Sequence, residues 1–250
     1  MLYISGQPDG IFRKGGALTP EVSEESFGVT VVIPAINEAG NIVAVLDDFS
    51  AVAQKVLPVL GPSGDDLHAI VERYGLKAIK DNGEGKGAAI QKAIMSVDTP
   101  IIVFADADCS HRAEDIPALI APIRENKADF VIGSRVRGGS DEWGGGLEDT
   151  LRLVGNILIT SLINLRFHVR LTDTLSGYRA IRTTCARDLN LREKYHTIEH
   201  EMVIKALRAG YRVAETPCHE YRRLHGRSTL SFRRQWIRFI YSAVRYLVFP

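Results

Sequence analysis

The chain has 250 residues, of which 45% are hydrophobic and 24% charged, and this composition suits one globular domain with a substantial core. A formal net charge of +1 argues against a nucleic-acid partner bound through bulk charge. Three cysteines without metal-ligand spacing, no basic-then-apolar leader and no long uncharged apolar stretch predict a cytoplasmic protein with free thiols that does not span a membrane.

Residues 1–27 are rich in glycine, proline, serine and charge without a clear period, so we expect a flexible N-terminal extension. In chain order, the patterns then predict a strand at 29–33, a helix at 37–54, a strand at 57–60, a helix at 65–74, a strand at 77–80, a helix at 87–96, a strand at 100–105, a helix at 112–126 and a strand at 129–133. Pro58 fits poorly in a central strand because it has no backbone N–H. Strands that alternate with helices predict an α/β fold, a Rossmann-like, mostly parallel sheet flanked by helices.

Residues 28–230 are predicted to form one domain, and residues 231–250 an amphipathic, basic C-terminal helix. Its arginines Arg234, Arg238 and Arg245 fall within about 40° of one another on a helical projection, beside many apolar residues. An earlier apolar stripe at helical spacing consists of Leu147, Leu151, Val154, Leu158, Leu162 and Leu165. Both patterns favour helices that lie in the plane of an anionic membrane surface. The alternative is that both helices pack on the domain or on a second subunit.

Two aspartates, Asp106 and Asp108, directly follow the strongest predicted strand, 100–105. In α/β sheets, ligands bind beyond the carboxyl ends of the strands, and residues two apart in an extended chain point the same way. Both carboxylates are therefore expected to face one site, where they suit Mg²⁺ or Mn²⁺, ions that also bind substrate phosphates. The alternative is that the pair caps the following helix.

Six short motifs then follow one another in an informative order. They are VIPAINE (32–38), GKGAA (85–89), DADCSH (106–111), IGSR (132–135), DTLSGYR (173–179) and GRSTL (226–230). Together they resemble family 2 glycosyltransferases of the GT-A fold, and within that family the dolichol-phosphate-mannose-synthase-like enzymes that use polyprenol phosphates. The resemblance runs from about residue 28 to residue 231, and it implies a nucleotide-sugar donor and a divalent metal.

In similar enzymes, the turn after the first strand contacts the nucleotide. Lys86 stands between two glycines at the start of a predicted helix, a setting that favours an anion. The donor site implied by the resemblance comprises Pro34, Ala35, Asn37, Glu38, Lys86, Asp106, Ala107 and Asp108, with the metal held by Asp106, Asp108 and Ser110. For Asn37 and Glu38, helix capping is a further role that the sequence allows.

The chain departs from the family pattern at the second strand. Similar enzymes carry Asp-Asp-Gly-Ser there, and an aspartate of that motif binds the nucleotide, whereas Leu60 and Gly61 occupy the matching positions here. Ile36 also replaces the usual tyrosine of the first motif. Either Asp65 or Asp66 substitutes for the missing acids, or donor binding is weakened, or activity has been lost.

A phosphate acceptor implies arginines, because a guanidinium group binds phosphate in a bidentate manner. Arg135, Arg152 and Arg223 fall at or near the phosphate-binding arginines of similar enzymes, and Thr229 replaces a lysine common among them. The motif at 173–179 surrounds the sugar and acceptor in those enzymes, which brings Asp173, Ser176 and Tyr178 into consideration.

The sequence therefore predicts a metal-dependent, inverting glycosyltransferase with Asp106, Asp108, Arg135 and Arg223 as catalytic residues. Its donor is expected to be a GDP- or UDP-sugar and its acceptor a polyprenyl or dolichyl phosphate. We expect the protein at the inner face of a membrane as a peripheral protein, with homo-oligomerisation as an option. Two alternatives are the same donor chemistry on a soluble acceptor, and a relative that binds nucleotide-sugars without catalysis.

Overall fold

The computed structural model describes residues 3–4, 28–143, 146–226 and 232–248. Most of the predicted extension 1–27, the residues Arg227 and Thr229, and the predicted boundary between residues 230 and 231 lie outside this part of the chain. Within the predicted extension, β1 (Tyr3–Ile4) forms a strand that pairs antiparallel with β8 (Val213–Pro217).

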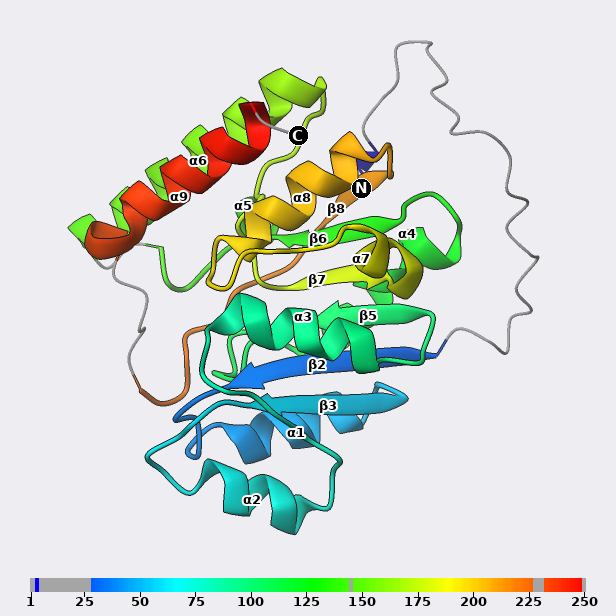
Figure 1. The fold of residues 1–250 in the computed structure, drawn as a ribbon, viewed down its shortest axis with the longest axis vertical. Helices are drawn as coiled ribbons and strands as arrows, with labels where there is room; N and C mark the ends of the chain where they lie inside the picture. Colours follow the sequence, from blue (N-terminus) through cyan, green and yellow to red (C-terminus); the bar gives the residue numbers. More distant parts are fainter. Residues whose placement is uncertain (1–2, 5–27, 144–145, 227–231, 249–250) are drawn as a thin grey trace.

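Within the described residues, eight strands form one sheet in the order β1-β8-β6-β7-β5-β2-β3-β4 (Figure 1). The remaining strands are β2 (Val29–Ala35), β3 (Lys55–Leu60), β4 (Ile79–Lys80), β5 (Ile101–Phe104), β6 (Phe130–Ser134) and β7 (Arg179–Arg182). The set β5-β2-β3-β4 is parallel, as is the pair β6-β8, whereas β7 runs antiparallel to both of its neighbours, β5 and β6. The predicted fold class, a mostly parallel sheet flanked by helices, is thereby confirmed.

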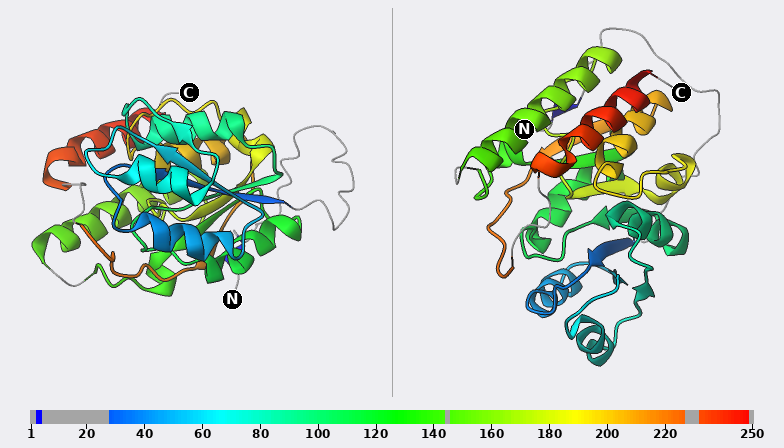
Figure 2. Two further views of the ribbon diagram at one scale, coloured as in Figure 1. Left: turned by 90° about the horizontal axis from the view of Figure 1, so that it is seen from below. Right: turned by 60° about the vertical axis from the view of Figure 1, so that its left-hand side comes forward.

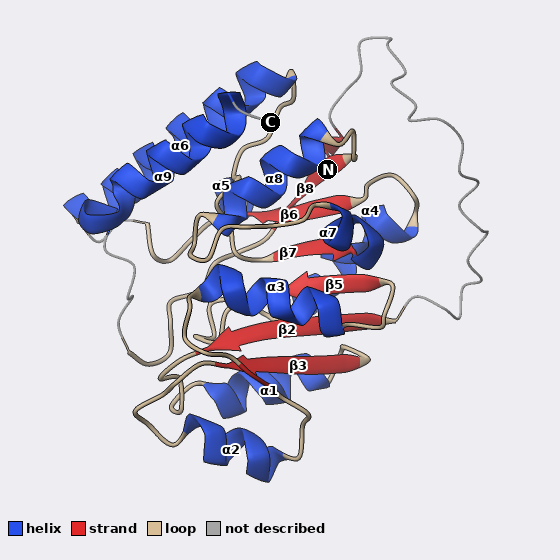
Figure 3. Cartoon of the chain, in the orientation of Figure 1, coloured by secondary structure: helices blue, strands red, loops and turns tan. Residues whose placement is uncertain are grey.

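Helices cover both faces of the sheet (Figures 2 and 3). One layer comprises α1 (Ile42–Ser50), α2 (Leu67–Tyr74) and α4 (Ile116–Arg124), and the other comprises α3 (Lys86–Ser96), α6 (Leu147–Phe167), α7 (Thr183–Asp188), α8 (Ile198–Arg208) and α9 (Phe232–Val248). Successive residues of a strand point to opposite faces. In β2, Val31 and Ile33 accordingly pack under the first layer and Val32 under the second.

The first helix is shorter than its predicted range, 37–54. Residues 36–40 form a turn in which Asn37 adopts a φ of 55°, a left-handed conformation that does not continue into a helix. The N–H groups of Asn41 and Ile42 both donate to the Glu38 carbonyl, at 3.0 and 2.9 Å. Consequently α1 begins only at Ile42, and the turn is left free to face a ligand site at the end of β2.

Pro58 does lie in an interior strand, β3, between β2 and β4. The neighbouring β4 pairs only with Val59 and Leu60 and stops short of the proline. Because no β4 residue lies opposite Pro58, the lack of a backbone N–H at Pro58 costs the sheet no hydrogen bond on that side of the strand.

α6 and α9 pack side by side next to α8 (Figure 1). Both helices turn one face to the core, through Ile159 and Ile163 of α6 and through Phe239 and Ala243 of α9. Their outer faces carry exposed apolar side chains, which are Val154, Ile157, Leu158, Leu162 and Leu165 on α6 and Ile237, Ile240, Tyr241, Val244 and Val248 on α9. We call these ten residues the outer apolar stripes. Among the described residues, no helix has both the length and the apolar composition needed to cross a membrane.

Candidate active site

A cavity of about 500 Å³, a size typical of small-molecule sites, opens at the carboxyl ends of β2, β3, β4 and β5. Residues of α6 and of the segments 195–199 and 220–223 complete its wall. The charged lining comprises eight acids, Glu38, Asp81, Asp106, Asp108, Glu142, Asp149, Glu199 and Glu220, and four bases, Lys86, Arg135, Arg152 and Arg223. This excess of acids over bases favours a bound cation.

Asp106 forms an ion pair with Lys86 at the centre of the cavity. The Lys86 Nζ atom lies 2.7 Å from Asp106 Oδ1 and 2.9 Å from Glu199 Oε1. Burial by itself would raise the pKa of the Asp106 carboxyl, but the charges of Lys86 and His111 outweigh it and hold the pKa well below its usual range. Burial disfavours the charged form of Lys86 too, yet Asp106 and Glu199 raise its pKa overall. Asp106 is therefore ionised at any physiological pH.

Asp108 points into the same cavity and pairs with Arg223, whose Nη2 atom lies 2.7 Å from Asp108 Oδ2. Ser110 donates to Asp108 Oδ1 through both its hydroxyl (2.6 Å) and its backbone N–H (3.1 Å). The structure thus brings Asp106, Asp108, Ser110 and Arg223 together, as the sequence predicts. Among the described residues, no cluster of three or more His, Cys, Asp or Glu side chains is placed to hold a metal. Substrate phosphates and water would have to supply the remaining ligands, as is usual for Mg²⁺.

At the other end of the cavity, Arg135 is held by acids. It donates from Nε and Nη2 to the two carboxylate oxygens of Asp173, at 2.7 and 3.0 Å, and from Nη1 to Glu220, at 3.2 Å. Of the five N–H groups of a guanidinium, these bonds leave two for a ligand. Trp143 lies against the same guanidinium, with 6.0 Å between its ring centroid and Cζ, and Arg152 of α6 lines this end as well. A phosphate group would find an arginine-rich setting here.

The glycines of the Gly85-Lys86-Gly87 motif have a different role from the one expected. A Cβ on Gly85 would lie 2.4 Å from the Lys194 carbonyl oxygen, and one on Gly87 would lie 2.1 Å from the Glu193 carbonyl oxygen. The N–H groups of Gly87 and Ala88 both donate to the Lys194 carbonyl, at 2.8 and 3.2 Å. The start of α3 is therefore capped by the chain itself, through the amides of Gly87 and Ala88. The side chain of Lys86 meets Asp106 and Glu199, two residues that line the cavity.

Only part of the predicted nucleotide turn lies at the cavity. Pro34, Ala35 and Glu38 line the cavity, and so does Ala107 between the two aspartates. Asn37 does not line it, because its left-handed backbone turns its exposed side chain away, where Oδ1 accepts the N–H of Gly64 at 2.7 Å. Asn37 therefore ties the turn to the neighbouring loop, and its assignment as a nucleotide contact stays a prediction.

The motif at 173–179 lies behind the cavity wall. Asp173, Ser176 and Tyr178 are all buried and do not line the cavity, although Leu175 and Gly177 do. Tyr178 stacks on His111, with 4.6 Å between the ring centroids, and the Nδ1 atom of that histidine accepts the Asp106 N–H at 3.1 Å. A Cβ on Gly177 would lie 2.7 Å from Asp106 Oδ2. Through these contacts the motif packs against Asp106 from behind the cavity wall.

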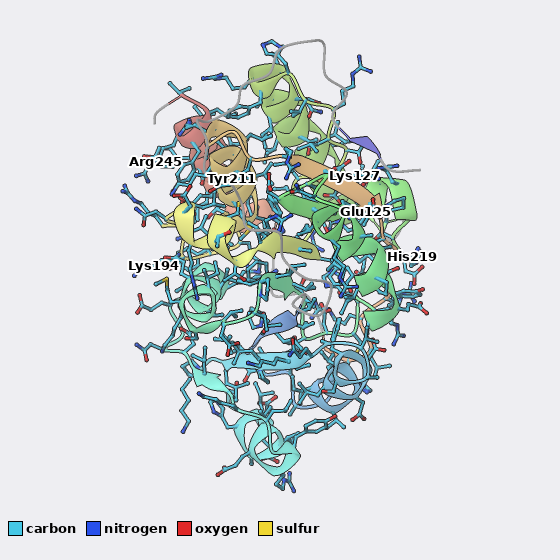
Figure 4. All side chains as sticks on the ribbon, turned by 90° about the vertical axis from the view of Figure 1, so that its right-hand side faces the viewer. Glu125, Lys127, Lys194, Tyr211, His219 and Arg245 are labelled. Atoms are coloured by element: carbon cyan, nitrogen blue, oxygen red, sulfur yellow. The ribbon has the colours of Figure 1, made fainter. Side chains whose placement is uncertain are left out.

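Sequence reasoning missed several lining residues, which are Asp81, Trp143, Tyr195, His196 and Glu199. Lys194 and His219, labelled in Figure 4, lie on opposite flanks of the molecule, and the residues that follow them, Tyr195 and Glu220, both reach the cavity. Burial, and then Lys86, lower the pKa of His196, so its imidazole is neutral at pH 7. The unusually polar run from His196 to Glu201 was the one signal in the sequence that polar side chains are buried here.

The sequence of residues 30–189 matches the family model described as Glycosyl transferase family 2. The chain belongs to this family and is a glycosyltransferase, as its motifs predict. An uncharacterized glycosyltransferase of Mycobacterium tuberculosis is 29% identical over 203 residues, which cover 81% of this chain and 89% of that protein. A dolichyl-phosphate hexose transferase of Haloferax volcanii is 27% identical over 204 residues, which cover 81% of this chain and 86% of that protein.

Among solved structures, glucosyl-3-phosphoglycerate synthase of Mycobacterium tuberculosis, in complex with Mn²⁺, UDP and phosphoglyceric acid, aligns with a TM-score of 0.72. The alignment covers 90% of this chain and 80% of that chain at 19% sequence identity. At this level of identity the similarity establishes the shared fold, which agrees with the predicted GT-A architecture.

Proposed function

We propose that the protein transfers a sugar, with inversion at the anomeric carbon, from a UDP- or GDP-sugar to a polyprenyl or dolichyl phosphate. The observation that carries this proposal is one cavity that holds the Asp106–Asp108 pair and also the arginines Arg135 and Arg152. One end suits a metal-bound diphosphate and the other suits a phosphate monoester. The dolichyl-phosphate hexose transferase of Haloferax volcanii supports a lipid phosphate as acceptor. The UDP and Mn²⁺ in the structural neighbour support the donor.

The side chains at the centre of the cavity fit Mg²⁺ or Mn²⁺. Asp106 and Asp108 offer carboxylate oxygens, Ser110 adds a hydroxyl beside them, and the low pKa of Asp106 keeps that ligand charged. When bound there, the ion would neutralise charge that develops on the departing nucleoside diphosphate. Lys86 lies beside Asp106 and is placed to contribute to the same neutralisation.

On the acceptor side, the two free N–H groups of Arg135 hold the phosphate, and Arg223 joins it from the Asp108 side. A phosphate monoester has a second pKa of about 6, so it is mostly dianionic at neutral pH and needs no general base. One of its oxygens attacks the anomeric carbon from the face opposite the nucleotide. The bond from that carbon to the diphosphate oxygen breaks, and the electron pair leaves with the nucleoside diphosphate.

α6 connects the acceptor end of the cavity to an apolar exterior. Arg152, Leu153 and Asn156 line the cavity, whereas Val154 and Leu158 of the same helix lie on its outer apolar stripe. A lipid whose phosphate enters beside Arg152 would leave its chain next to such a surface. This arrangement supports a peripheral location on the inner face of a membrane. Use of the same stripes for homo-oligomerisation is the competing role.

The proposal is tested by nucleotide release from a panel of UDP- and GDP-sugars with Mg²⁺ or Mn²⁺ and a short polyprenyl phosphate. We expect release only when metal, donor and lipid are all present. Phosphoglyceric acid serves as the soluble acceptor in a parallel reaction, because the structural neighbour was solved with it. Release with that acceptor alone would favour the soluble alternative. Metal-dependent nucleotide binding without release under any condition would favour a non-catalytic relative.

The metal site is tested by Asp108→Ala. Removing this carboxylate takes away one of two charged ligands, so we expect kcat/KM to fall at least about a hundredfold. The fold should persist, because Asp108 lies at the cavity wall and not in the apolar core. Asp98→Ala, which breaks the exposed pair with Lys55, is the matched control and should keep full activity. Near-normal turnover of the Asp108 variant would refute the assignment.

A further inference from the structure

Besides its centre and the end at Arg135, the cavity has a further part at the carboxyl ends of β3 and β4. The lining of this part is less charged than the centre. It comprises Ala35, Ile36, Val59 and Gly61, which carry no polar side chain, and the acidic residue Asp81. Adjacent strands lie about 4.8 Å apart, so the three steps from β5, which precedes Asp106, to β4, which precedes Asp81, span roughly 14 Å. An extended nucleoside diphosphate can cover such a span, with its diphosphate at Asp106 and its base at Asp81.

The acids considered for this end from sequence do not reach it. Asp65 accepts the N–H groups of Ala39, at 2.9 Å, and of Leu67, at 3.2 Å, and neither it nor Asp66 lines the cavity. A side chain at position 61 is blocked, because a Cβ on Gly61 would lie 2.4 Å from Ile36 Cγ1 and 2.6 Å from its Cδ1. The two departures from the family pattern, Ile36 and Gly61, therefore fit together. The isoleucine fills the space that a larger residue at position 61 would need.

Asp81 is anchored beside this position. Its N–H donates to the Leu60 carbonyl at 2.8 Å, and its Oδ2 atom accepts the N–H of Gly83 at 3.0 Å. Six of the eight cavity acids have a lysine or arginine within ion-pair distance. Within the described part of the chain, Asp81 has no such cation, and its carboxylate is half-buried. A carboxylate accepts through about four lone pairs, so unused acceptor positions remain for a ligand.

We propose that Asp81 accepts a hydrogen bond from the ring N–H of a keto base, uracil N3–H or guanine N1–H, and that Ile36 provides the aliphatic surface on which the base lies. The role of Asp81 rests on the proposed function, because the base belongs to the nucleotide-sugar donor. A carboxylate can only accept. It is attracted to a base that carries a ring N–H, and it is repelled by adenine and cytosine, whose corresponding ring nitrogens are acceptors. Asp81 thus selects the base by attraction and by repulsion.

Calorimetry with UDP, GDP, CDP and ADP, each with Mn²⁺, tests this role. We expect the wild-type protein to bind UDP or GDP at least about tenfold more tightly than CDP and ADP, and Asp81→Ala to lose that preference. Asp81→Asn, which retains an acceptor for the Gly83 N–H, should shift the preference toward CDP. Asp66→Ala is the matched control, because Asp66 lies outside the cavity without a side-chain cap bond, and its preferences should equal those of the wild type.

Base-methylated ligands make the test independent of folding. N3-methyl-UDP and N1-methyl-GDP lack the ring N–H. Each should bind the wild type about tenfold more weakly than the unmethylated nucleotide does, whereas Asp81→Ala should bind the methylated and unmethylated nucleotides equally well. Equal methylation penalties in both proteins would overturn the role of Asp81. Metal-dependent binding that ignores the base in the wild type would overturn this role alone. A wild-type protein that binds none of the four nucleotides would overturn the proposed function as well.

Discussion

Arg223 has two competing partners at the active site. Its guanidinium lies 2.7 Å from Asp108 and 3.7 Å from Glu38, and the proposed acceptor phosphate would draw it toward the arginine-rich end of the cavity. A divalent ion on Asp108 would compete with Arg223 for the same carboxylate. Arg223 is therefore expected to weaken metal binding when no acceptor is present, and to be released toward the phosphate when a metal binds.

Substitution of Arg223 by alanine separates these two roles. Because a competing positive charge is removed from Asp108, we expect Arg223→Ala to bind Mn²⁺ alone roughly tenfold more tightly, while transfer to a lipid phosphate falls at least about a hundredfold. Calorimetry measures the first effect and the release assay the second. Arg222→Ala is the control, since that exposed residue bonds to Asp141 through its backbone N–H. Unchanged or weaker Mn²⁺ binding by the Arg223 variant would exclude the competition.

At the residue scale, the sequence predicted the groups that sit in short motifs beside strand ends. Asp106 and Asp108 are examples, because a strand that runs into D-x-D fixes where both carboxylates point. It did not predict Glu199, which reaches the cavity only through the packing of a distant segment, or Asp81, which follows the short strand β4 but belongs to none of the six motifs. It also gave no indication of the left-handed backbone at Asn37, whose side chain bonds to the N–H of Gly64.

At the element scale, the interface between α8 and α9 depends on a neutral histidine. His200 of α8 is fully buried, its Nε2 atom lies 3.0 Å from the Ser242 hydroxyl of α9, and its ring lies 5.8 Å from that of Phe239. Its Nδ1 atom has no hydrogen-bond partner within the described residues. Burial, and then the charge of Arg179, lower the pKa of His200 to about 3.

This low pKa makes the stability of the protein depend on pH. An unfolded histidine has a pKa of about 6.5, so between pH 6.5 and 3 the unfolded chain binds a proton that folded His200 does not. The contribution of His200 to the free energy of unfolding is complete above pH 6.5 and is lost as the pH falls. Between pH 7.5 and 5 we expect the wild type to lose up to about 2 kcal/mol more than His200→Gln.

Denaturant unfolding at the two pH values measures this difference. His225→Gln is the matched control, because His225 is exposed and its ring takes part in none of the described hydrogen bonds. That variant should keep the pH dependence of the wild type. If His200→Gln also kept it, the buried histidine would not be the group responsible.

The elements themselves were largely predictable, but their pairing was not. The strands at 29–33, 100–105 and 129–133 appear as β2, β5 and β6 with small changes at their ends, because β-branched apolar runs are strong local signals. The antiparallel insertion of β7 between β5 and β6 has no local signature. Such a pairing is decided by the packing of the whole sheet, which a reading of local periodicity does not include.

At the scale of the whole molecule, α6 and α9 lie side by side (Figure 2). Each of them carries one of the outer apolar stripes. The sequence predicted a stripe on each helix, and it left open whether the domain would cover them. Each helix instead buries its opposite face, and residues such as Leu158, Leu165 and Tyr241 remain more than half exposed. The exposed arginines Arg238 and Arg245 lie on α9 among these apolar residues, a combination that favours an anionic lipid surface.

Flotation with lipid vesicles tests this surface directly. We expect the wild type to bind vesicles that contain anionic lipid. In the double variant Leu158→Glu/Tyr241→Glu, binding should fall roughly tenfold or more, because two apolar side chains that would enter the lipid are replaced by charges that anionic lipid repels. Met95→Glu is the matched control, since Met95 is 72% exposed but lies on α3, outside both stripes, and it should bind as the wild type does. Sedimentation equilibrium of the same proteins distinguishes the competing role. If the double variant turned a wild-type dimer into a monomer and bound vesicles normally, the stripes would form a subunit interface and not a membrane contact.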